Sequence, residues 1–402
     1  MEKLMAVISL MTTRKKPTSP ETSIDRSTIC RILWGWPGCS ICEAQNKLNR
    51  NCTNSGCPGT RLNSLQCFFQ HYQETAASYI PELLPGVPPA LASHEDLLRL
   101  ISHIKQHPTL TREELARSFF SVQLGSHGRG PTEADQGRAL CTALKAMSMV
   151  DCSGLEHVGT EPLTRGISQA SSWGPTDSYK NLWTSIFPTK ACPELNTSPT
   201  SSIIMSNLSA RKLVKTGGLK LQGTNDLRNH LGLDTKSGIL EIYHFTSVLK
   251  EHLYETRDRP DAWGNIPREL ALETLATTYN ILFPFGDIGS QSILRKLIRK
   301  EGFDTDCRRS ASTAYRRPEE DQAAFNFKYW GTRLMDLYDE VDDPTPRGYL
   351  ERWFQRKSGA RYVMMATLVG VGIAIILGIF GLAVGIFQAW VAYQQWQHRV
   401  SA

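Results

Sequence analysis

The residues with the clearest capacity for chemistry are cysteines near the start of the chain. Six of the ten cysteines fall between residues 30 and 67: Cys30, Cys39, Cys42, Cys52, Cys57 and Cys67. Zinc is held in proteins by four nitrogen or sulfur ligands arranged as a tetrahedron. The pairs Cys39-x2-Cys42 and Cys52-x4-Cys57 could supply four thiolates, so a structural zinc site is one interpretation of this segment.

Two other interpretations of the same cysteines stay open. The second pair is more widely spaced than in most zinc modules, so a segment that binds no metal is the simplest alternative. A disulfide cluster is the third, because thiols pair in oxidising compartments and stay reduced in the cytosol. The choice among the three therefore depends on which side of a membrane the segment lies.

No catalytic constellation is recognisable elsewhere, and no residue is proposed as catalytic or cofactor-binding. The sequence has no phosphate loop, no dinucleotide-binding glycine motif after a strand and no nucleophile elbow. His103 and His107 are four residues apart and could share a metal. The adjacent glutamate of metalloproteases is missing, so we expect this histidine pair to face solvent.

The elements that would position these residues are predicted to be mainly α-helical. Residues 97–104 carry apolar side chains at three- and four-residue spacing, which is typical of a helix. Thr111-x-x-Glu114 has the form of a capping box, and Thr132 can cap a further helix. Residues 78–155 are therefore predicted to form a helical lobe.

A second helical lobe is predicted over residues 206–342. Within it, Thr224 is expected to cap a helix, Pro267 opens a longer one, and residues 239–243 are either a short strand or the start of a helix. Residues 156–205 are rich in Ser, Thr, Pro and Gly and form a predicted long linker between the lobes, which docks through its aromatic side chains.

The first 77 residues precede both lobes. They form a Cys-rich segment that is expected to be partly disordered, because their short apolar runs are separated by polar residues and glycines.

A long apolar run near the C-terminus predicts a transmembrane helix. Residues 362–397 contain no Asp, Glu, Lys, Arg or His. At about 1.5 Å per residue, a helix of about 25 residues covers about 37 Å, which exceeds the roughly 30 Å hydrocarbon core of a bilayer. We predict a basic juxtamembrane helix over 343–361, a transmembrane helix over 362–387 and a short tail over 388–402.

The charges beside this run predict its direction. Five basic residues precede it and one arginine follows it: Arg347, Arg352, Arg356, Lys357 and Arg361 before, and Arg399 after. Basic flanks stay on the cytoplasmic side. The bulk of the chain is therefore predicted to be cytosolic, in the layout of a tail-anchored, single-pass protein. Glycans on the sequons at Asn51, Asn196 or Asn207 would contradict this orientation.

Small residues recur along the predicted membrane helix. They lie four apart in two sets joined by a step of three: Gly370, Ala374 and Gly378, then Gly381, Gly385 and Ala389. Eleven residues turn a helix by nearly whole turns, so both sets share one face. Small faces let membrane helices approach closely. The stripe predicts a homo-oligomer or packing on a partner membrane helix, although glycine is also common in membrane helices generally.

The overall charge argues against a nucleic-acid partner. Lys and Arg number 45 against 39 Asp and Glu, a net charge of +6 over 402 residues. Nucleic-acid-binding proteins usually concentrate their basic residues on one face. The expected partners are instead the lipid bilayer and an unidentified cytosolic protein.

Several stretches resemble a group of uncharacterised single-pass membrane proteins of filamentous fungi. The clearest lie in the C-terminal third, SGARYVMMATLVGV at 358–371 and FQAWVAYQQW at 387–396. Three more lie at 83–101, 224–234 and 269–275. The resemblance implies a fungal single-pass membrane protein and carries no functional residues with it.

These observations predict a membrane-tethered, mainly α-helical protein that acts as a non-enzymatic interaction or regulatory module. An accessory protein or enzyme of fungal specialised metabolism, with a site assembled from dispersed residues, is one alternative. A deep polar pocket with converging carboxylates or histidines would favour it. A zinc-dependent adaptor is the other alternative.

Overall fold

The computed structural model describes residues 26–39, 41–42, 52, 57–82, 84–121, 130–152, 173–259, 264–308, 313–322, 325–345, 347 and 361–399. The chain divides into two compact units, Met1–Pro344 and Thr345–Ala402. The predicted N-terminal residues before Arg26, and residues 348–360 of the predicted juxtamembrane helix, lie outside the described residues.

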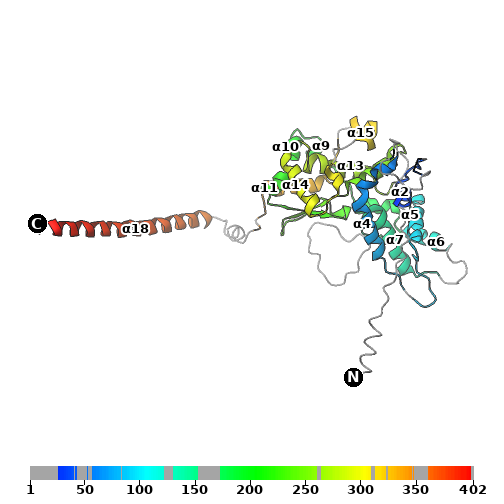
Figure 1. Cartoon of the computed structure of the whole chain (residues 1–402), viewed down its shortest axis with the longest axis horizontal. Coiled ribbons are helices and arrows are strands. Elements are labelled where there is room, and N and C mark those ends of the chain that lie inside the picture. Colours follow the sequence, from blue (N-terminus) through cyan, green and yellow to red (C-terminus); the bar gives the residue numbers. More distant parts are fainter. Residues whose placement is uncertain are drawn as a thin grey trace, which may run out of the picture. The chain divides into compact units, whose positions relative to one another are not determined.

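The first unit is mainly helical, as predicted (Figure 1). Its α-helices are α2 (Arg26–Trp34), α4 (Gln66–Ser78), α5 (His94–Gln106), α6 (Arg112–Ser121), α7 (Glu133–Ser148), α8 (Tyr179–Ile186), α9 (Pro193–Asn196), α10 (Ser201–Asn207), α11 (Ala210–Lys215), α12 (Thr246–Arg257), α13 (Arg268–Ala276), α14 (Ile288–Lys300), α15 (Pro318–Gln322) and α16 (Gly331–Asp342). Short 3-10 segments are η1 (Pro58–Leu65), η3 (Leu227–Asn229), η5 (Thr305–Arg308) and η6 (Thr313–Tyr315), and α13 continues into the π-helical η4 (Thr277–Leu282).

Local capping explains where several helices begin. The Thr111 hydroxyl accepts from the Glu114 backbone N–H while the Glu114 carboxylate accepts from Thr111, which confirms the predicted capping box. Thr132 caps α7 as predicted, because its hydroxyl accepts from the backbone N–H of Asp135. Such caps satisfy backbone donors that a helix leaves open at its N-terminus.

A small three-stranded sheet lies in the later part of this unit. Its strands β1 (Lys220–Thr224), β2 (Gly232–Asp234) and β3 (Ile239–Tyr243) are ordered β1-β3-β2. β3 pairs with β1 in parallel and with β2 in antiparallel fashion. Residues 239–243 were predicted to form either a short strand or the start of a helix, and the structure shows the strand. The helix expected after Thr224 is absent from the described residues there, which form the end of β1 and the short η3.

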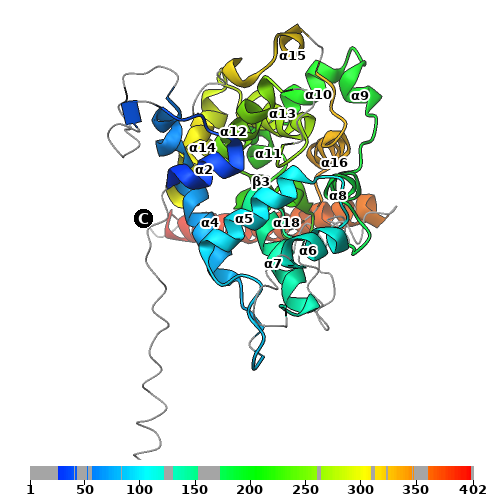
Figure 2. The same ribbon diagram turned by 90° about the vertical axis from the view of Figure 1, so that its right-hand side faces the viewer.

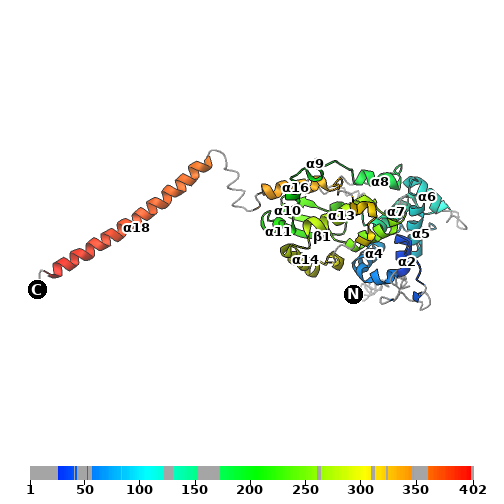
Figure 3. The same ribbon diagram turned by 90° about the horizontal axis from the view of Figure 1, so that it is seen from above.

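The two predicted lobes lie toward opposite ends of one unit and share a core. In Figures 1 and 3, helices α4 to α7 gather at one end and α10, α11 and α14 at the other. One continuous cluster of buried side chains nevertheless runs from Ile29 to Leu337. The N-terminal segment joins them: α2 packs against α5 of the first lobe and, with η1, against α12 of the second, and Lys105 of α5 pairs with Glu255 of α12.

The segment predicted to be partly disordered supplies part of that core. Its described portion contains α2, η1 and α4, and α2 lies beside α5 (Figure 2). Leu33, Leu65 and Phe68 are each fully buried. These residues fold because their apolar faces cover α5, α7 and α12, which are remote in sequence.

The predicted linker is partly helical. Its described residues, 173–205, hold α8, α9 and most of α10. The expectation that it docks through aromatic side chains is confirmed, since Trp173, Trp183 and Phe187 are all buried. Residues 156–172 lie outside the described part of the chain.

The second unit contains one long helix, α18 (Arg361–Arg399). Residues Thr367–Gln397 are long and apolar enough to cross a membrane: their most apolar stretch of 18 residues has a mean hydropathy of 2.6, and none of that stretch is buried in the protein. Their 31 residues extend about 46 Å as a helix. The helix continues past Phe387, the predicted end of the membrane span, and residues 388–397 contain no proline that would break it.

Candidate functional site

The four cysteines singled out by their spacing come together in space. The Sγ atoms of Cys39, Cys42, Cys52 and Cys57 all lie within 4.8 Å of one another. Two of the separations are 3.7 Å, between Cys39 and Cys52, and 3.5 Å, between Cys42 and Cys57. In a tetrahedral zinc site with bonds of about 2.3 Å, neighbouring sulfurs are about 3.8 Å apart. The thiols are therefore spaced as zinc ligands are.

Short local elements place these thiols. Cys39 and Cys42 follow the buried residue Trp36, beyond the end of α2, and Cys57 immediately precedes η1. Cys39, Cys42 and Cys57 are buried, whereas Cys52 is partly exposed. The group forms a small cluster of its own, separate from the main hydrophobic core.

Backbone N–H groups of neighbouring residues donate hydrogen bonds to the sulfurs of Cys39 and Cys57. Hydrogen bonds from the backbone of Cys42 and Ile41 to Cys39 contribute to lowering the pKa of that thiol to about 6, the Cys42 bond having the largest effect. Burial raises the pKa of Cys57 to about 12, against the opposing effect of a backbone hydrogen bond from Gly59. Backbone N–H groups that point at sulfur stabilise a thiolate, which is the form that binds metals.

Three further residues of the Cys-rich segment, Cys30, Cys67 and His71, do not belong to this group. Cys30 is fully buried in the main core, and Cys67 on α4 is half-buried. Desolvation raises the pKa of Cys67, which keeps it a neutral thiol. His71 lines a different pocket, described below. Spacing alone therefore selected the four cysteines that converge.

The two flanks of the cysteine group meet at one buried carboxylate. Glu251 of α12 accepts a hydrogen bond from the Trp36 indole N–H at 2.9 Å and pairs with Arg61 Nε at 2.9 Å. The Arg61 guanidinium also lies over the rings of Trp36 and Tyr254, 5.5 and 4.2 Å from their centroids. Burial raises the pKa of Glu251 to about 7, and Arg61 opposes that rise.

The two histidines that could share a metal, His103 and His107, contact each other, and His103 also contacts Ser118. The rings of His103 and His107 are 4.8 Å apart, and His103 Nε2 lies 2.8 Å from the Ser118 hydroxyl. His107 is exposed, as expected, while His103 is partly buried. Among the described residues, no third ligand joins them in a metal-binding group.

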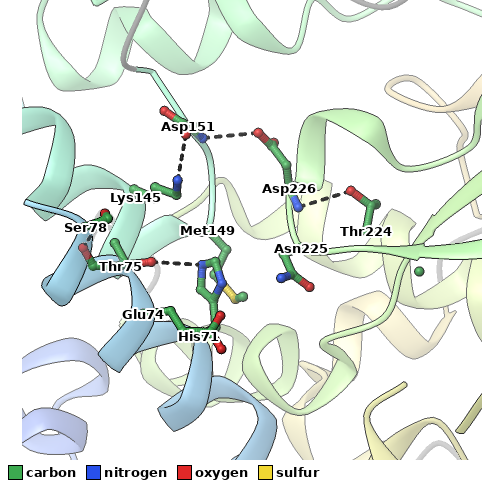
Figure 4. Close-up of a pocket in the computed structure, with 11 residues that line it drawn as sticks. His71, Glu74, Thr75, Ser78, Lys145, Met149, Asp151, Thr224, Asn225 and Asp226 are labelled. Carbon is green, nitrogen blue, oxygen red and sulfur yellow. Dashed lines mark hydrogen bonds and ion pairs between the residues drawn. The ribbon is translucent and has the colours of Figure 1, made fainter. Parts of the chain in front are cut away.

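A polar pocket of about 520 Å³ lies between α4, the end of α7 and the end of β1 (Figure 4). Sequence reasoning missed it because its residues come from three distant segments: His71, Glu74, Thr75, Ser78, Lys145, Met149, Asp151, Gly223, Thr224, Asn225 and Asp226. The Lys145 ammonium pairs with Asp151 at 2.7 Å, and the Asp151 backbone N–H donates to Asp226.

The ionisable groups of this pocket are largely satisfied by one another. Asp226 also pairs with Arg228 at 2.6 Å. His71 lies 3.4 Å from the Thr75 hydroxyl, and burial lowers its pKa so that the ring is neutral near pH 7. A general base and a nucleophile need to contact each other or a substrate. In the described part of the pocket, the contact of this type is the one between His71 and the Thr75 hydroxyl, and at 3.4 Å it is a long hydrogen bond.

No protein-family model, curated protein or solved structure matches the chain.

Proposed function

We propose that this protein is a single-pass membrane protein whose first unit is a cytosolic, non-enzymatic interaction or regulatory module. The observation that carries the proposal is α18, in which Thr367–Gln397 is strongly apolar and has no protein surface covering it. Exposed apolar area of this extent is unfavourable in water and favourable in a bilayer. The aromatic residues Trp390, Tyr393 and Trp396 suit a membrane interface.

The charge distribution supports a cytosolic first unit. Five basic residues lie between Arg347 and Arg361, against Arg399 alone after the span. Basic residues close to a span are retained on the cytoplasmic side. A reducing compartment also suits Cys42 and Cys57, whose sulfurs are 3.5 Å apart, farther than the roughly 2.05 Å of a disulfide bond.

Membrane extraction and protease protection of the full chain test this proposal. We expect the native protein to stay in the membrane pellet at alkaline pH, and a tag at its N-terminus to be digested without detergent. Leu377→Arg with Phe380→Arg should release the protein, because each arginine at the centre of a span costs about 2.5–3.5 kcal/mol.

A matched pair of arginines in the first unit, Gln70→Arg with Ser206→Arg, should leave membrane retention unchanged, because both positions are exposed. Native protein in the supernatant would contradict anchoring. Glycans at Asn196 or Asn207 that an endoglycosidase removes would instead contradict the orientation alone.

The polar pocket favours a second candidate function, an accessory enzyme or metabolite-binding protein. Its volume of about 520 Å³ is in the range of small-molecule sites, and it brings His71 near three carboxylates. The mutual pairing of its charged groups supports the non-enzymatic proposal. Thermal stabilisation by a small polar metabolite that is lost in Asp226→Leu would favour the second candidate.

A further inference from the structure

We infer that Cys39, Cys42, Cys52 and Cys57 form a tetrahedral thiolate site for Zn²⁺, and that the ion holds the segment between Trp36 and Arg61 against α12. This inference concerns the first unit alone. It goes beyond membrane anchoring and stands whether or not α18 spans a bilayer.

The geometry fits zinc more closely than the alternatives. The two sulfur separations of 3.7 and 3.5 Å are close to the edge of a zinc–thiolate tetrahedron. All four sulfurs lie within 4.8 Å, so one ion can reach each of them with small side-chain adjustments. Oxygen-preferring ions such as Mg²⁺ and Ca²⁺ would find no oxygen ligand among these four side chains.

Among the described residues, the hydrophobic cluster that contains these sulfurs consists of cysteines alone. The buried part of the cluster consists of three cysteines, Cys39, Cys42 and Cys57, with Cys52 packed against them. Four small side chains bury little apolar area, and thiols make weak hydrogen bonds. In small metal-binding segments of this kind, the free energy of metal binding is what orders the chain.

The residues that flank the cysteine group on its two sides, Trp36 and Arg61, both contact Glu251. Trp36 lies three residues before Cys39 and Arg61 four residues after Cys57, and both contact the carboxylate of Glu251. An ion bound between these flanks fixes their separation, and so brings the indole N–H and the guanidinium to the same buried acid. Glu251 is 3% exposed. Without the ion, Trp36 and Arg61 would be held less firmly against its carboxylate.

Metal analysis of the purified full chain in detergent tests the inference. We expect about one zinc per chain, and Co²⁺ substitution should give the visible bands of a tetrahedral cobalt–thiolate centre. Cys42→Ser and Cys57→Ser should each weaken metal binding by at least about tenfold. Cys67→Ser is the matched control, since Cys67 is a half-buried thiol outside the group and should leave the zinc content unchanged.

A second measurement separates a specific site from general misfolding. Removal of zinc by a chelator should speed hydrogen exchange in residues 30–38 and 57–65, and added zinc should restore the protection. Exchange in α14 should stay unchanged, because this helix packs mainly against α11, η5 and β1.

Alkylation of the native protein, followed by mass measurement, decides between the remaining outcomes. Four thiols that react only after chelation support the zinc site. Four thiols that react at once in the protein as purified, before any chelator is added, would overturn it, and so would two disulfides found there that open with a reductant.

Discussion

Buried histidines make the stability of this protein depend on pH at the level of single residues. His252 on α12 is fully buried, and its Nδ1 accepts a hydrogen bond from the Trp34 indole at 3.1 Å. Burial lowers the pKa of His252 to about 3, and Lys105 contributes to the same shift. His230 and His244 are likewise buried and have pKa values lowered to about 3 and about 4, chiefly by desolvation.

The direction of the effect follows from proton binding. An unfolded histidine takes up a proton below about pH 6.5, whereas folded His252 stays neutral down to about pH 3. Its contribution to stability is therefore complete above pH 6.5 and is lost as the pH falls, by up to about 1.4 kcal/mol per pH unit.

His252→Asn should remove this part of the acid sensitivity, because the amide oxygen can still accept from Trp34 and does not titrate. Chemical denaturation in detergent at pH 5, 6 and 7.5 measures the effect. The free energy of unfolding of the variant should fall less steeply below pH 6.5, whereas His107→Asn, at an exposed position, should match the native protein. Equal slopes for His252→Asn and the native protein would contradict the prediction.

At the scale of elements, α12 is the organising helix of the first unit. Its side chains Lys250, Glu251 and His252 are all buried, and Glu255 is almost so. Each has a partner from another segment, including Asp306 for Lys250 at 2.7 Å and Lys105 for Glu255 at 2.6 Å. The Lys105 ammonium also donates to the carbonyl groups of Ile32 and Leu33 at the end of α2.

Removal of one member of such a pair should be costly. Lys105→Ala should destabilise the protein by roughly 3–5 kcal/mol, because it leaves the Glu255 carboxylate buried without its cation. The isosteric double variant Lys105→Met with Glu255→Leu should recover much of that loss. Arg117→Ala breaks a pair of which both members are more than 60% exposed, and should change stability by less than about 1 kcal/mol. Equal losses in the single and double variants would show that charge burial is not the cause.

The helix starts at Thr111 and Thr132 were predictable because a capping side chain and its backbone partner are three residues apart. The spacing of Cys39 with Cys42 and of Cys52 with Cys57 suggested two pairs of metal ligands in the same way, whereas the contact between the two pairs spans 13 to 15 residues and is seen only in the structure. The parallel pairing of β1 with β3 was not predictable, since it requires a crossover between the strands that no local pattern specifies.

The burial of α12 escaped prediction for a related reason. Its sequence, TSVLKEHLYETR, has the polar content of a surface helix. The indoles of Trp36 and Trp34, which donate to Glu251 and His252, lie more than 210 residues earlier in the chain. The shared core of the two predicted lobes was missed with it, because α2, from the segment expected to be partly disordered, packs against both α5 and α12.

At the scale of the whole molecule, the small-residue stripe of α18 bears on association between copies. At about 100° per residue, Gly370, Ala374, Gly378, Gly381, Gly385 and Ala389 fall within an arc of about 100°. A Cβ atom added at Gly378 or Gly381 would meet nothing within the protein. Substitutions at these glycines can therefore affect contacts with another helix while leaving the chain's own packing intact.

Gly378→Leu with Gly381→Leu should weaken self-association in a membrane two-hybrid assay, because bulky side chains keep helix backbones apart. Gly372→Leu with Ala383→Leu is the matched control, since both positions lie on the opposite face of the helix. Equal signals from the two double variants would show that the stripe is not an interface.

The pairing of α2 with α12 also has a consequence for biosynthesis. Trp34 reaches its hydrogen-bond partner His252 only after 218 more residues have been added to the chain. At about 5–20 residues per second, the ribosome needs roughly 11–44 s to do so. During that interval the indole N–H groups of Trp34 and Trp36 lack their native acceptors on α12, so this stretch is where a chaperone would be expected to engage during translation.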